Sequence, residues 1–299
     1  MIPRLRIGNQ TAIACAERME PFEFALRHGF GAFEWFADKK EYPGGSAAGW
    51  DESDMDQGLR AWIRDTGQAH DIRFTVHAPW QANPLHPDGV PLLIRSVDFA
   101  RDIGADLVNL HLNMAEGAPG FVRSLEPVIR YAAESGLRLS IENTPRTTPA
   151  DFNQTFASLR ELDAVGPGTV GMCLDLGHAN LCTPTHNDFI RYIDELAPEV
   201  PIIHLHVHEN YGDADSHLTL FTGPARIDDA GVRAFLERLR RRDYHGALIL
   251  EQWPRPPQLL IEAATRLREL LSLSSPGRVD GGPRIEWGPN PTFQPPAAK

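Results

Sequence analysis

The stretch "LVNLHLNMAEGAPGFVRSLEPVIRYAAESGLRLSIE", residues 107–142, holds one complete unit of the pattern that decides the fold. Two short apolar runs, 107–112 and 137–142, have the length and composition of buried β-strands. The segment between them carries apolar residues at helical spacing and closes on Gly136, where a helix C-cap is expected. A strand, a helix and a second strand in this order predict a βαβ unit of a parallel sheet.

The same alternation continues along the whole chain. Further strands are predicted at 4–8, 31–36, 72–77, 170–175, 201–207 and 246–251. Helices are predicted between them, including "DDAGVRAFLERLRRRDYHG" (228–246), which closes on Gly246, and "PPQLLIEAATRLRELLSL" (256–273). Eight strands alternating with eight helices predict an α/β protein with a closed (β/α)₈ barrel, the TIM barrel. The rival, a doubly wound open sheet, is expected to show a Gly-rich phosphate loop after an early strand, and the sequence has none.

The chain is predicted to hold one domain followed by a tail. Residues 1–273 carry the strand and helix patterns and form the predicted barrel domain. Residues 274–299, "SSPGRVDGGPRIEWGPNPTFQPPAAK", are rich in Pro and Gly and lack periodicity, so they are predicted to be an irregular C-terminal tail.

Composition limits the function classes. The 299 residues are 42% hydrophobic and 23% charged, as in globular proteins. No apolar run is long enough to span a membrane, and the first residues lack the apolar core of a signal peptide, so a cytoplasmic protein is expected. The three cysteines, Cys15, Cys173 and Cys182, lack CxxC spacing, so a bound metal would be held by imidazole and carboxylate groups. The net charge of −11 argues against a nucleic-acid partner.

Polar residues of metal-binding types stand at the predicted strand ends. The carboxyl ends of the strands of a (β/α)₈ barrel meet at one mouth, where the chemistry is located. Six strands each contribute one such residue near their carboxyl end: His77, His111, Glu142, Asp175, His206 and Glu251. His178 follows Asp175 by one turn. This set predicts a metal site at the mouth.

A supporting tier is predicted beneath these residues. Side chains two positions apart in a strand share a face. Two positions before each of the six strand-end residues stand Thr75, Asn109, Ser140, Cys173, His204 and Ile249, and all of these except Ile249 can form hydrogen bonds. In "HLHVHENYGDADSH" (204–217), His204 is expected to support from below and His208 to reach the rim, each in a structural role. Asp215 and His217 follow in the next loop, where both can reach one ion.

Four motifs carry a resemblance to a known group: "IENTP" (141–145), "GMCLDLGHANL" (171–181), "HVHENYGDADSHLTLFTGPARID" (206–228) and "LILEQ" (248–252). From about residue 5 to 270 the chain resembles the xylose isomerase-like barrels, which include the sugar phosphate isomerase/epimerase family and the endonuclease IV-type apurinic endonucleases. The resemblance implies a metal quartet at Glu142, Asp175, His206 and Glu251. It implies, in the epimerases, proton transfer by the two glutamates. The endonuclease branch implies a trinuclear zinc cluster with the further ligands His77, His111, His178, Asp215 and His217.

The chain departs from both specialised branches. Leu112 and Asn113 stand where the endonucleases have Pro-Gly, and Leu176 and Gly177 stand where they have Thr-Cys. Ketose 3-epimerases have an arginine near the position of Gly212. The resemblance is therefore to the group and not to either branch.

Two enzyme classes and one non-catalytic class follow as hypotheses. The first is a sugar, sugar phosphate or polyol isomerase, epimerase or related lyase that uses Mn²⁺, Mg²⁺ or Zn²⁺, with Glu142, Glu251 and His178 as catalytic residues. Its small carbohydrate substrate would contact Trp35, Trp80, His111 and Trp253. The second is a trinuclear zinc hydrolase acting on phosphodiesters, which the many histidines favour and the acidic mouth segment "ENYGDAD" disfavours. The third hypothesis is a subunit that has no catalytic activity of its own and depends on a partner. The sequence leaves open whether the protein forms a homo-oligomer.

Overall fold

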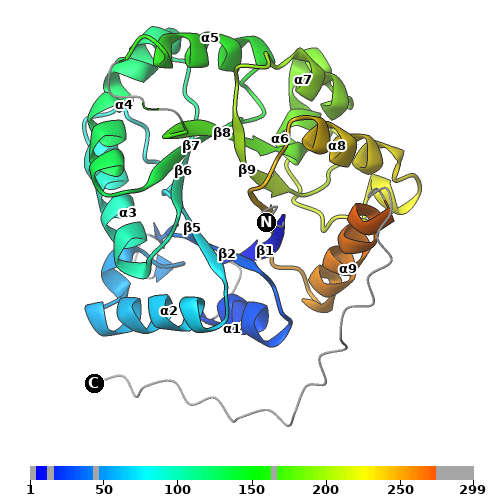
Figure 1. Ribbon diagram of the computed structural model, residues 1–299, viewed down its shortest axis with the longest axis horizontal. Coiled ribbons are helices and arrows are strands. Elements are labelled where there is room, and N and C mark those ends of the chain that lie inside the picture. Colours follow the sequence, from blue (N-terminus) through cyan, green and yellow to red (C-terminus); the bar gives the residue numbers. More distant parts are fainter. Residues whose placement is uncertain (1–4, 12–16, 43–46, 163–165, 167, 274–299) are drawn as a thin grey trace.

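Eight parallel strands close into a barrel in the computed structural model, which describes residues 5–11, 17–42, 47–162, 166 and 168–273. Around the barrel the strand order is β1-β10-β9-β8-β7-β6-β5-β2 (Figure 1). The strands are β1 Arg6–Gln10, β2 Ala32–Phe36, β5 Arg73–His77, β6 Leu107–His111, β7 Arg138–Glu142, β8 Val170–Asp175, β9 Ile202–Val207 and β10 Ala247–Leu250. The predicted (β/α)₈ barrel is confirmed, and the first strand lies two residues later than predicted.

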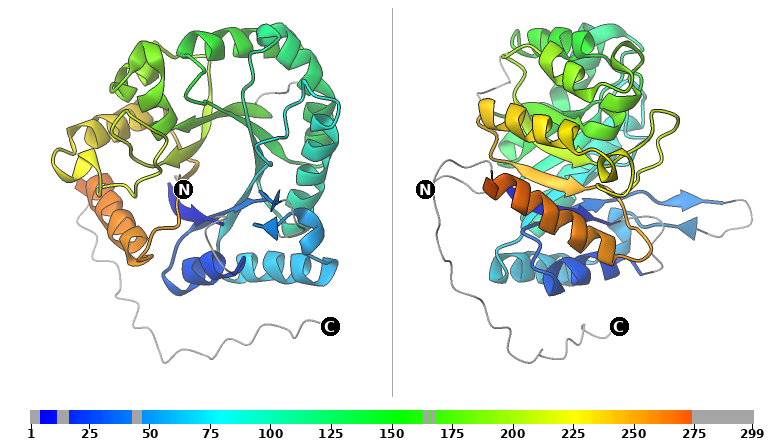
Figure 2. Two further views of the ribbon diagram at one scale, coloured as in Figure 1. Left: turned by 180° about the vertical axis from the view of Figure 1, so that it is seen from behind. Right: turned by 90° about the vertical axis from the view of Figure 1, so that its right-hand side faces the viewer.

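Helices form a layer around the barrel (Figures 1 and 2). They are α1 Glu20–Arg27, α2 Gln57–Ala69, α3 Gly89–Ile103, α4 Gly117–Glu134, α5 Pro149–Leu159, α6 Leu176–Leu181, α7 Phe189–Glu195, α8 Ala230–Arg241 and α9 Gln258–Leu273. Short 3₁₀ helices span Glu52–Asp54, Thr183–Thr185 and Pro224–Arg226. The sequence did not predict α6, which begins directly at the end of β8 because the Asp175 side chain caps it by accepting a hydrogen bond from the His178 N–H.

The two predicted glycine caps have different outcomes. Gly136 follows α4 with a φ of 73°, and the Leu137 N–H bonds back to the Ala132 carbonyl, as a helix-ending glycine does. Gly246 does not cap α8. That helix ends at Arg241, and Asp243 takes the positive φ of 52° there.

The apolar core lies between the outer face of the barrel and the helices. On β2, Phe33 and Trp35 point outward and lie 5.2 Å, centroid to centroid, from the ring of Phe22 on α1. Phe74 of β5 packs against the same ring at 5.5 Å. Because alternate strand residues point the other way, the intervening residues of each strand face the barrel interior.

A small hairpin marks the carboxyl end of the barrel. Its strands, β3 Lys40–Glu41 and β4 Ala47–Ala48, are antiparallel, with Lys40 opposite Ala48. They project away from the barrel in the right-hand view of Figure 2. The sequence patterns did not predict this hairpin, whose strands are only two residues long.

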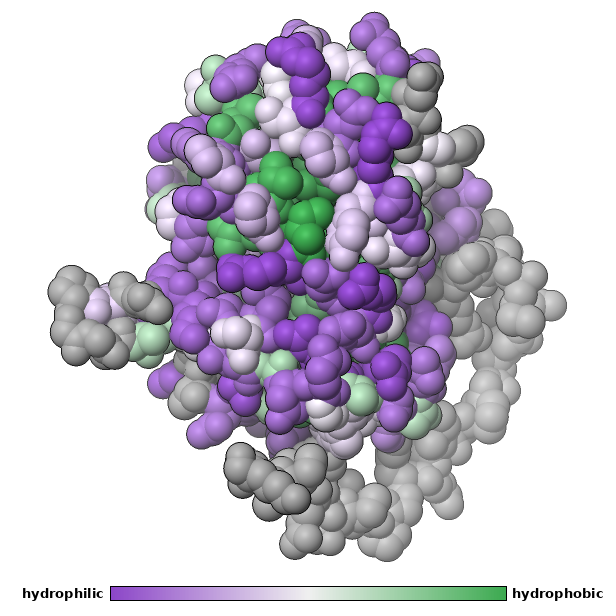
Figure 3. All heavy atoms as spheres, turned by 90° about the vertical axis from the view of Figure 1, so that its left-hand side faces the viewer, coloured by the Kyte–Doolittle hydropathy of each residue, from purple (hydrophilic) through white to green (hydrophobic). Residues whose placement is uncertain are grey.

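The face of the molecule drawn in Figure 3 is largely hydrophilic. Figure 3 shows one apolar area, framed by hydrophilic side chains, on the side that carries α3 and α4. None of the helices in the described part of the chain is long and apolar enough to cross a membrane.

We expect the barrel to fold without the predicted tail, residues 274–299, which lies outside the described residues. Helix α9 contributes Leu260, Ala263, Ala264, Leu267 and Leu270 to the buried core. Truncation after Leu273 should therefore change the melting temperature by no more than about 2 °C, as measured by circular dichroism. Truncation after Pro257, which removes α9, should abolish cooperative unfolding. A shorter chain that unfolds when only the tail is removed would contradict the prediction.

Candidate metal centre

The strand-end residues predicted from the sequence come together at the barrel mouth. His77, His111, Glu142 and Asp175 end β5, β6, β7 and β8, His206 is the fifth residue of β9, and Glu251 directly follows β10. Most of these side chains are buried, and His111 is 27% exposed. Parallel strands at similar register bring their last residues to one level, which explains why six separate segments meet.

Glu142 stands at the centre of the group. Its Oε2 lies 3.1 Å from His77 Nε2 and 3.3 Å from His206 Nδ1. Its Oε1 lies 3.4 Å from His178 Nδ1 and 3.6 Å from His111 Nε2. Burial alone would raise the pKa of Glu142, but the imidazoles, first His206 and then His111, hold it well below its usual value.

Glu142, Asp175 and Glu251 each approach His206 Nδ1. His206 Nδ1 lies 3.4 Å from Glu251 Oε2 and 4.0 Å from Asp175 Oδ2. One buried atom of each residue has no hydrogen-bond partner: Glu142 Oε1, Asp175 Oδ2, His206 Nδ1 and Glu251 Oε2. Buried polar atoms are rarely left unpaired, and a cation between them would satisfy all four. Three carboxylates and one imidazole suit Mn²⁺, Mg²⁺ or Zn²⁺.

A second group lies beside the first. His178 Nε2 and His217 Nε2 lie 3.2 Å and 3.4 Å from Asp215 Oδ2. The predicted pairing of Asp215 with His217 is therefore present in the geometry. His208, predicted to be a structural residue at the rim, is instead fully buried in this group, with Nε2 3.7 Å from Asp215 Oδ1.

Glu34 is the inward-facing residue that the sequence predictions missed. It lies on β2, with Oε1 2.7 Å from His206 Nε2 and Oε2 2.7 Å from His204 Nε2. Thr75 donates to Oε2 at 2.8 Å. Burial would raise the pKa of Glu34, but His206 and His204 hold it well below its usual value. A lone glutamate within the apolar run "AFEWF" was the signal that could have revealed it.

The tier predicted beneath the centre is largely present. His204 and Thr75 hold Glu34, while the Asn109 amide donates to Glu142 and accepts from the Ser140 hydroxyl at 2.7 Å. These contacts fix the side chains above them, as outer partners of metal ligands do.

The three tryptophans predicted to contact substrate lie in different places. Trp35 is fully buried among aromatic rings on the outer face of β2, so the predicted substrate contact is wrong for this residue. Its neighbour Glu34 takes the inward position because strand residues alternate. Trp80 is 57% exposed in the segment after β5, and Trp253 packs edge-on against Phe24 at 5.3 Å. The last two stay predictions.

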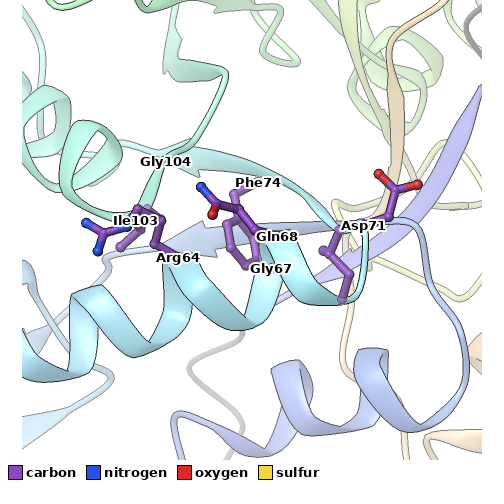
Figure 4. Close-up of a pocket in the computed structure, with 8 residues that line it drawn as sticks. Arg64, Gly67, Gln68, Asp71, Phe74, Ile103 and Gly104 are labelled. Atoms are coloured by element: carbon purple, nitrogen blue, oxygen red, sulfur yellow. The ribbon is translucent and has the colours of Figure 1, made fainter.

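Two cavities in the described part of the chain differ in their relation to the centre. One of about 320 Å³ lies between the C-terminal ends of α2 and α3, lined by residues such as Arg64, Asp71 and Phe74 (Figure 4). These helix ends lead into the amino ends of β5 and β6, so this cavity is at the opposite end of the barrel. A second cavity, of about 280 Å³, is lined by His208, Asn210 and other residues and adjoins the candidate centre.

The carboxylates favour protonated imidazoles. Burial would lower the pKa of each histidine, but neighbouring acidic groups hold it well above the usual value: first Asp175 for His178, and first Cys173, then Glu142 and Glu251, for His206. Burial would also lower the pKa of His217, but the hydrogen bond with Asp215 and the nearby charge of Glu251 raise it to about 10. The field that retains these protons would equally attract a metal cation.

Comparisons with known proteins agree with this architecture. Residues 22–270 match the family of the xylose isomerase-like TIM barrel, and the chain belongs to that family. An uncharacterised protein of Methanocaldococcus jannaschii is 25% identical over 179 residues, 55% of this chain and 67% of that protein. An uncharacterised protein of Sinorhizobium fredii is 29% identical over 175 residues, 54% of this chain and 51% of that protein, so the match spans about half the length of this relative.

Solved structures share the fold at low sequence identity. A D-tagatose 3-epimerase-like protein has a TM-score of 0.69 and 18% identity, covering 90% of this chain and 98% of that one. A D-psicose 3-epimerase studied with D-fructose has a TM-score of 0.66 and 15% identity, covering 89% and 99%. A Thermus thermophilus protein from crystals soaked with zinc chloride has a TM-score of 0.61 and 20% identity, covering 91% and 100%.

Replacing Asp175 by Asn should remove metal and keep the fold. Asn retains an oxygen that can cap α6 but loses the charge, so we expect metal affinity to fall by more than about 100-fold. Metal content after dialysis, with circular dichroism for folding, measures this. Asp188→Asn is the matched control, because Asp188 caps α7 away from the centre. Full metal occupancy in the Asp175 variant would disprove the assignment.

Metal binding at pH 7 should release protons. His178, His206 and His217 are held protonated by their raised pKa values, and a metal binds only neutral imidazole. Affinity should thus fall as the pH is lowered, by about tenfold per pH unit for each proton released. Calorimetric zinc titrations in two buffers of different ionisation enthalpy should show at least two protons released per chain. A heat that does not depend on the buffer would refute this.

Proposed function

We propose that this protein is a divalent-metal-dependent isomerase or epimerase of a small sugar, sugar phosphate or polyol. The observation that carries the proposal is the placement of two buried glutamates. Glu142 and Glu251 extend from β7 and β10, with β8 and β9 between them, and both reach His206 Nδ1, at 3.3 Å and 3.4 Å. Two carboxylates on either side of one point can serve two faces of one substrate carbon.

The proposed chemistry is proton transfer next to a carbonyl. A bound divalent ion would polarise the substrate carbonyl and thereby acidify the neighbouring C–H group. One glutamate then removes the proton from that carbon, and the other delivers a proton to the opposite face or to the neighbouring carbon. The Asn109 amide and the surrounding imidazoles hold Glu142 ionised and oriented for this role.

His178 is proposed to assist. Its backbone N–H is bound by Asp175, and its ring lies between Glu142, Asp175 and Asp215. In this position the ring, as a cation or through a metal ion bound to it, would add positive charge that can stabilise negative charge developing on a substrate oxygen. The epimerases among the solved structures with this fold support the proposed reaction class.

A second candidate function is a trinuclear zinc hydrolase acting on phosphodiesters. The observation in its favour is that all the residues implied by the endonuclease branch converge, including His77 and His111 on Glu142 and the group around Asp215. Several ions held close together could bind an attacking hydroxide and the leaving oxygen. The net charge of −11 disfavours a polyanionic substrate.

The glutamates and the first two histidines should differ in their effect on turnover. Glu142→Gln and Glu251→Gln keep an oxygen donor but lose the base, so turnover should fall by about 10²–10⁴-fold. His77→Ala and His111→Ala should retain measurable turnover. The assay is NMR of ketoses and their phosphates in deuterium oxide, in which wild type should introduce deuterium at carbon and the Gln variants should not.

The hydrolase would give the opposite pattern. Three zinc ions per chain, no exchange into any sugar, cleavage of a phosphodiester, and a His77→Ala variant as impaired as Glu142→Gln would replace the isomerase proposal with the hydrolase.

A further inference from the structure

His208 adds a fourth donor to the group formed by His178, Asp215 and His217. The potential ligand atoms of these four residues lie within 4.8 Å of one another. The resemblance seen in the sequence implies the other three as ligands but assigns no role to His208. Its position in the structure therefore raises the question of what the buried imidazole binds.

The distances match those of ligands that share one ion. In a tetrahedral zinc site with bonds of about 2.0–2.1 Å, neighbouring ligand atoms lie about 3.3 Å apart. Asp215 Oδ2 lies 3.2 Å from His178 Nε2 and 3.4 Å from His217 Nε2, and the other carboxylate oxygen, Oδ1, lies 3.7 Å from His208 Nε2. The His208 ring is nearly perpendicular to His178, so these two rings approach from different directions. The His208 and His217 rings are stacked at 4.0 Å with their planes 7° apart, so binding of one ion by both requires one of the two rings to turn.

The nitrogens of His208 lack hydrogen-bond partners. The side chain is fully buried, yet neither Nδ1 nor Nε2 makes a hydrogen bond with any described residue. Nε2 lies 3.2 Å from Asp175 Oδ1 and 3.9 Å from Glu251 Oε2. A buried imidazole that lies near three carboxylates without a well-formed hydrogen bond is costly, and a cation at Nε2 would remove much of that cost.

Gly177 makes room for this ring. A Cβ at position 177 would overlap Cε1 and both nitrogens of the His208 ring. Gly177 is the second residue of α6 and has a negative φ, so alanine would suit the backbone. The requirement for glycine here comes from the imidazole of His208 and not from the helix.

The loop after β9 is arranged to hold the group together. The Glu209 and Leu218 backbones form two mutual hydrogen bonds, each 2.8 Å long, which bring Asp215 and His217 back toward His208. The Glu209 carboxylate accepts hydrogen bonds from the N–H groups of Thr222, Gly223 and Ala225. One ion would join the strand, α6 and this loop.

We propose that His208 is the fourth protein ligand of a second metal subsite, with His178, Asp215 and His217, and that this subsite holds zinc in a closed, structural site. Three imidazoles and one carboxylate favour zinc, and four protein ligands leave no position for substrate. The Glu142, Asp175, His206 and Glu251 group has three carboxylates, which suit a six-coordinate ion such as Mn²⁺ or Mg²⁺, and such an ion keeps positions for substrate beside four protein ligands. The inference rests on the metal dependence of the proposed function but not on its reaction.

Zinc titration against a chromophoric chelator tests the proposal on the full chain. His208→Asn removes the ligand, and Gly177→Ala displaces it while leaving the imidazole in the sequence. Each variant should bind one zinc ion fewer per chain than wild type, or bind it more than about 100-fold more weakly. His217→Asn should behave in the same way.

Two matched controls should bind zinc as wild type does. His70→Asn removes an exposed histidine at the end of α2, and Gly31→Ala adds a methyl group that meets only ordinary contacts, at 3.7 Å and beyond. The cobalt-substituted wild type supplies a further measurement, because four-coordinate cobalt absorbs visible light far more strongly than six-coordinate cobalt. The second ion bound should give the strong spectrum, and Gly177→Ala should weaken it.

Unchanged zinc stoichiometry and affinity in both His208→Asn and Gly177→Ala would overturn the proposal. If His208→Asn does not fold, Gly177→Ala and the wild-type cobalt spectrum decide, and a weak, six-coordinate spectrum for both ions would also overturn it. A protein that shows the expected zinc losses but no sugar turnover would refute the proposed reaction and leave this subsite in place.

Discussion

Burial of the Glu142 carboxylate among imidazoles is the interaction on which the rest of the centre depends. An ionised carboxylate inside a barrel costs several kcal/mol unless opposite charge and hydrogen bonds surround it. Four histidines from β5, β6, β9 and α6 and the amide of Asn109 supply these partners. Asp175 and Glu251 add further negative charge nearby, so the centre as a whole requires cations.

The same electrostatic solution recurs one layer deeper. Glu34 is buried between His204 and His206 and accepts a hydrogen bond from Thr75. His206 belongs to both layers, since Nε2 lies against Glu34 and Nδ1 faces Glu142 and Glu251. A negative partner at one nitrogen makes the other a stronger ligand and fixes the ring orientation. Glu34 and its partners thus orient His206 for a role in the layer that contains Glu142.

The sequence predicted what depends on periodicity. Alternating strand and helix patterns predicted the barrel. The rule that parallel strands end at one mouth predicted Glu142, Asp175, His206 and Glu251 as neighbours, because residues at the same position in parallel strands lie at the same level of the barrel. The substrate contact predicted for Trp35 was wrong, and Glu34 was missed. Both residues lie on β2, and only the face of the strand on which each side chain lies decides which one points into the barrel. His208 was predicted at the rim and is instead buried, because its surroundings depend on a loop and on the absence of a side chain at Gly177, which no strand pattern encodes.

The loop after β9 contributes residues both to the candidate metal centre and to the cavity beside it. It supplies Asp215 and His217 to the second group, and its first residues, His208 to Tyr211, line the cavity of about 280 Å³ beside the centre. Glu209 fixes the loop from within through three backbone N–H groups. A change in this loop would therefore alter the ligands and the cavity together. Because Gly212 and Asp213 stand where the resemblance places the arginine of the ketose 3-epimerases, a substrate of the proposed reaction would be held by other groups around the same mouth.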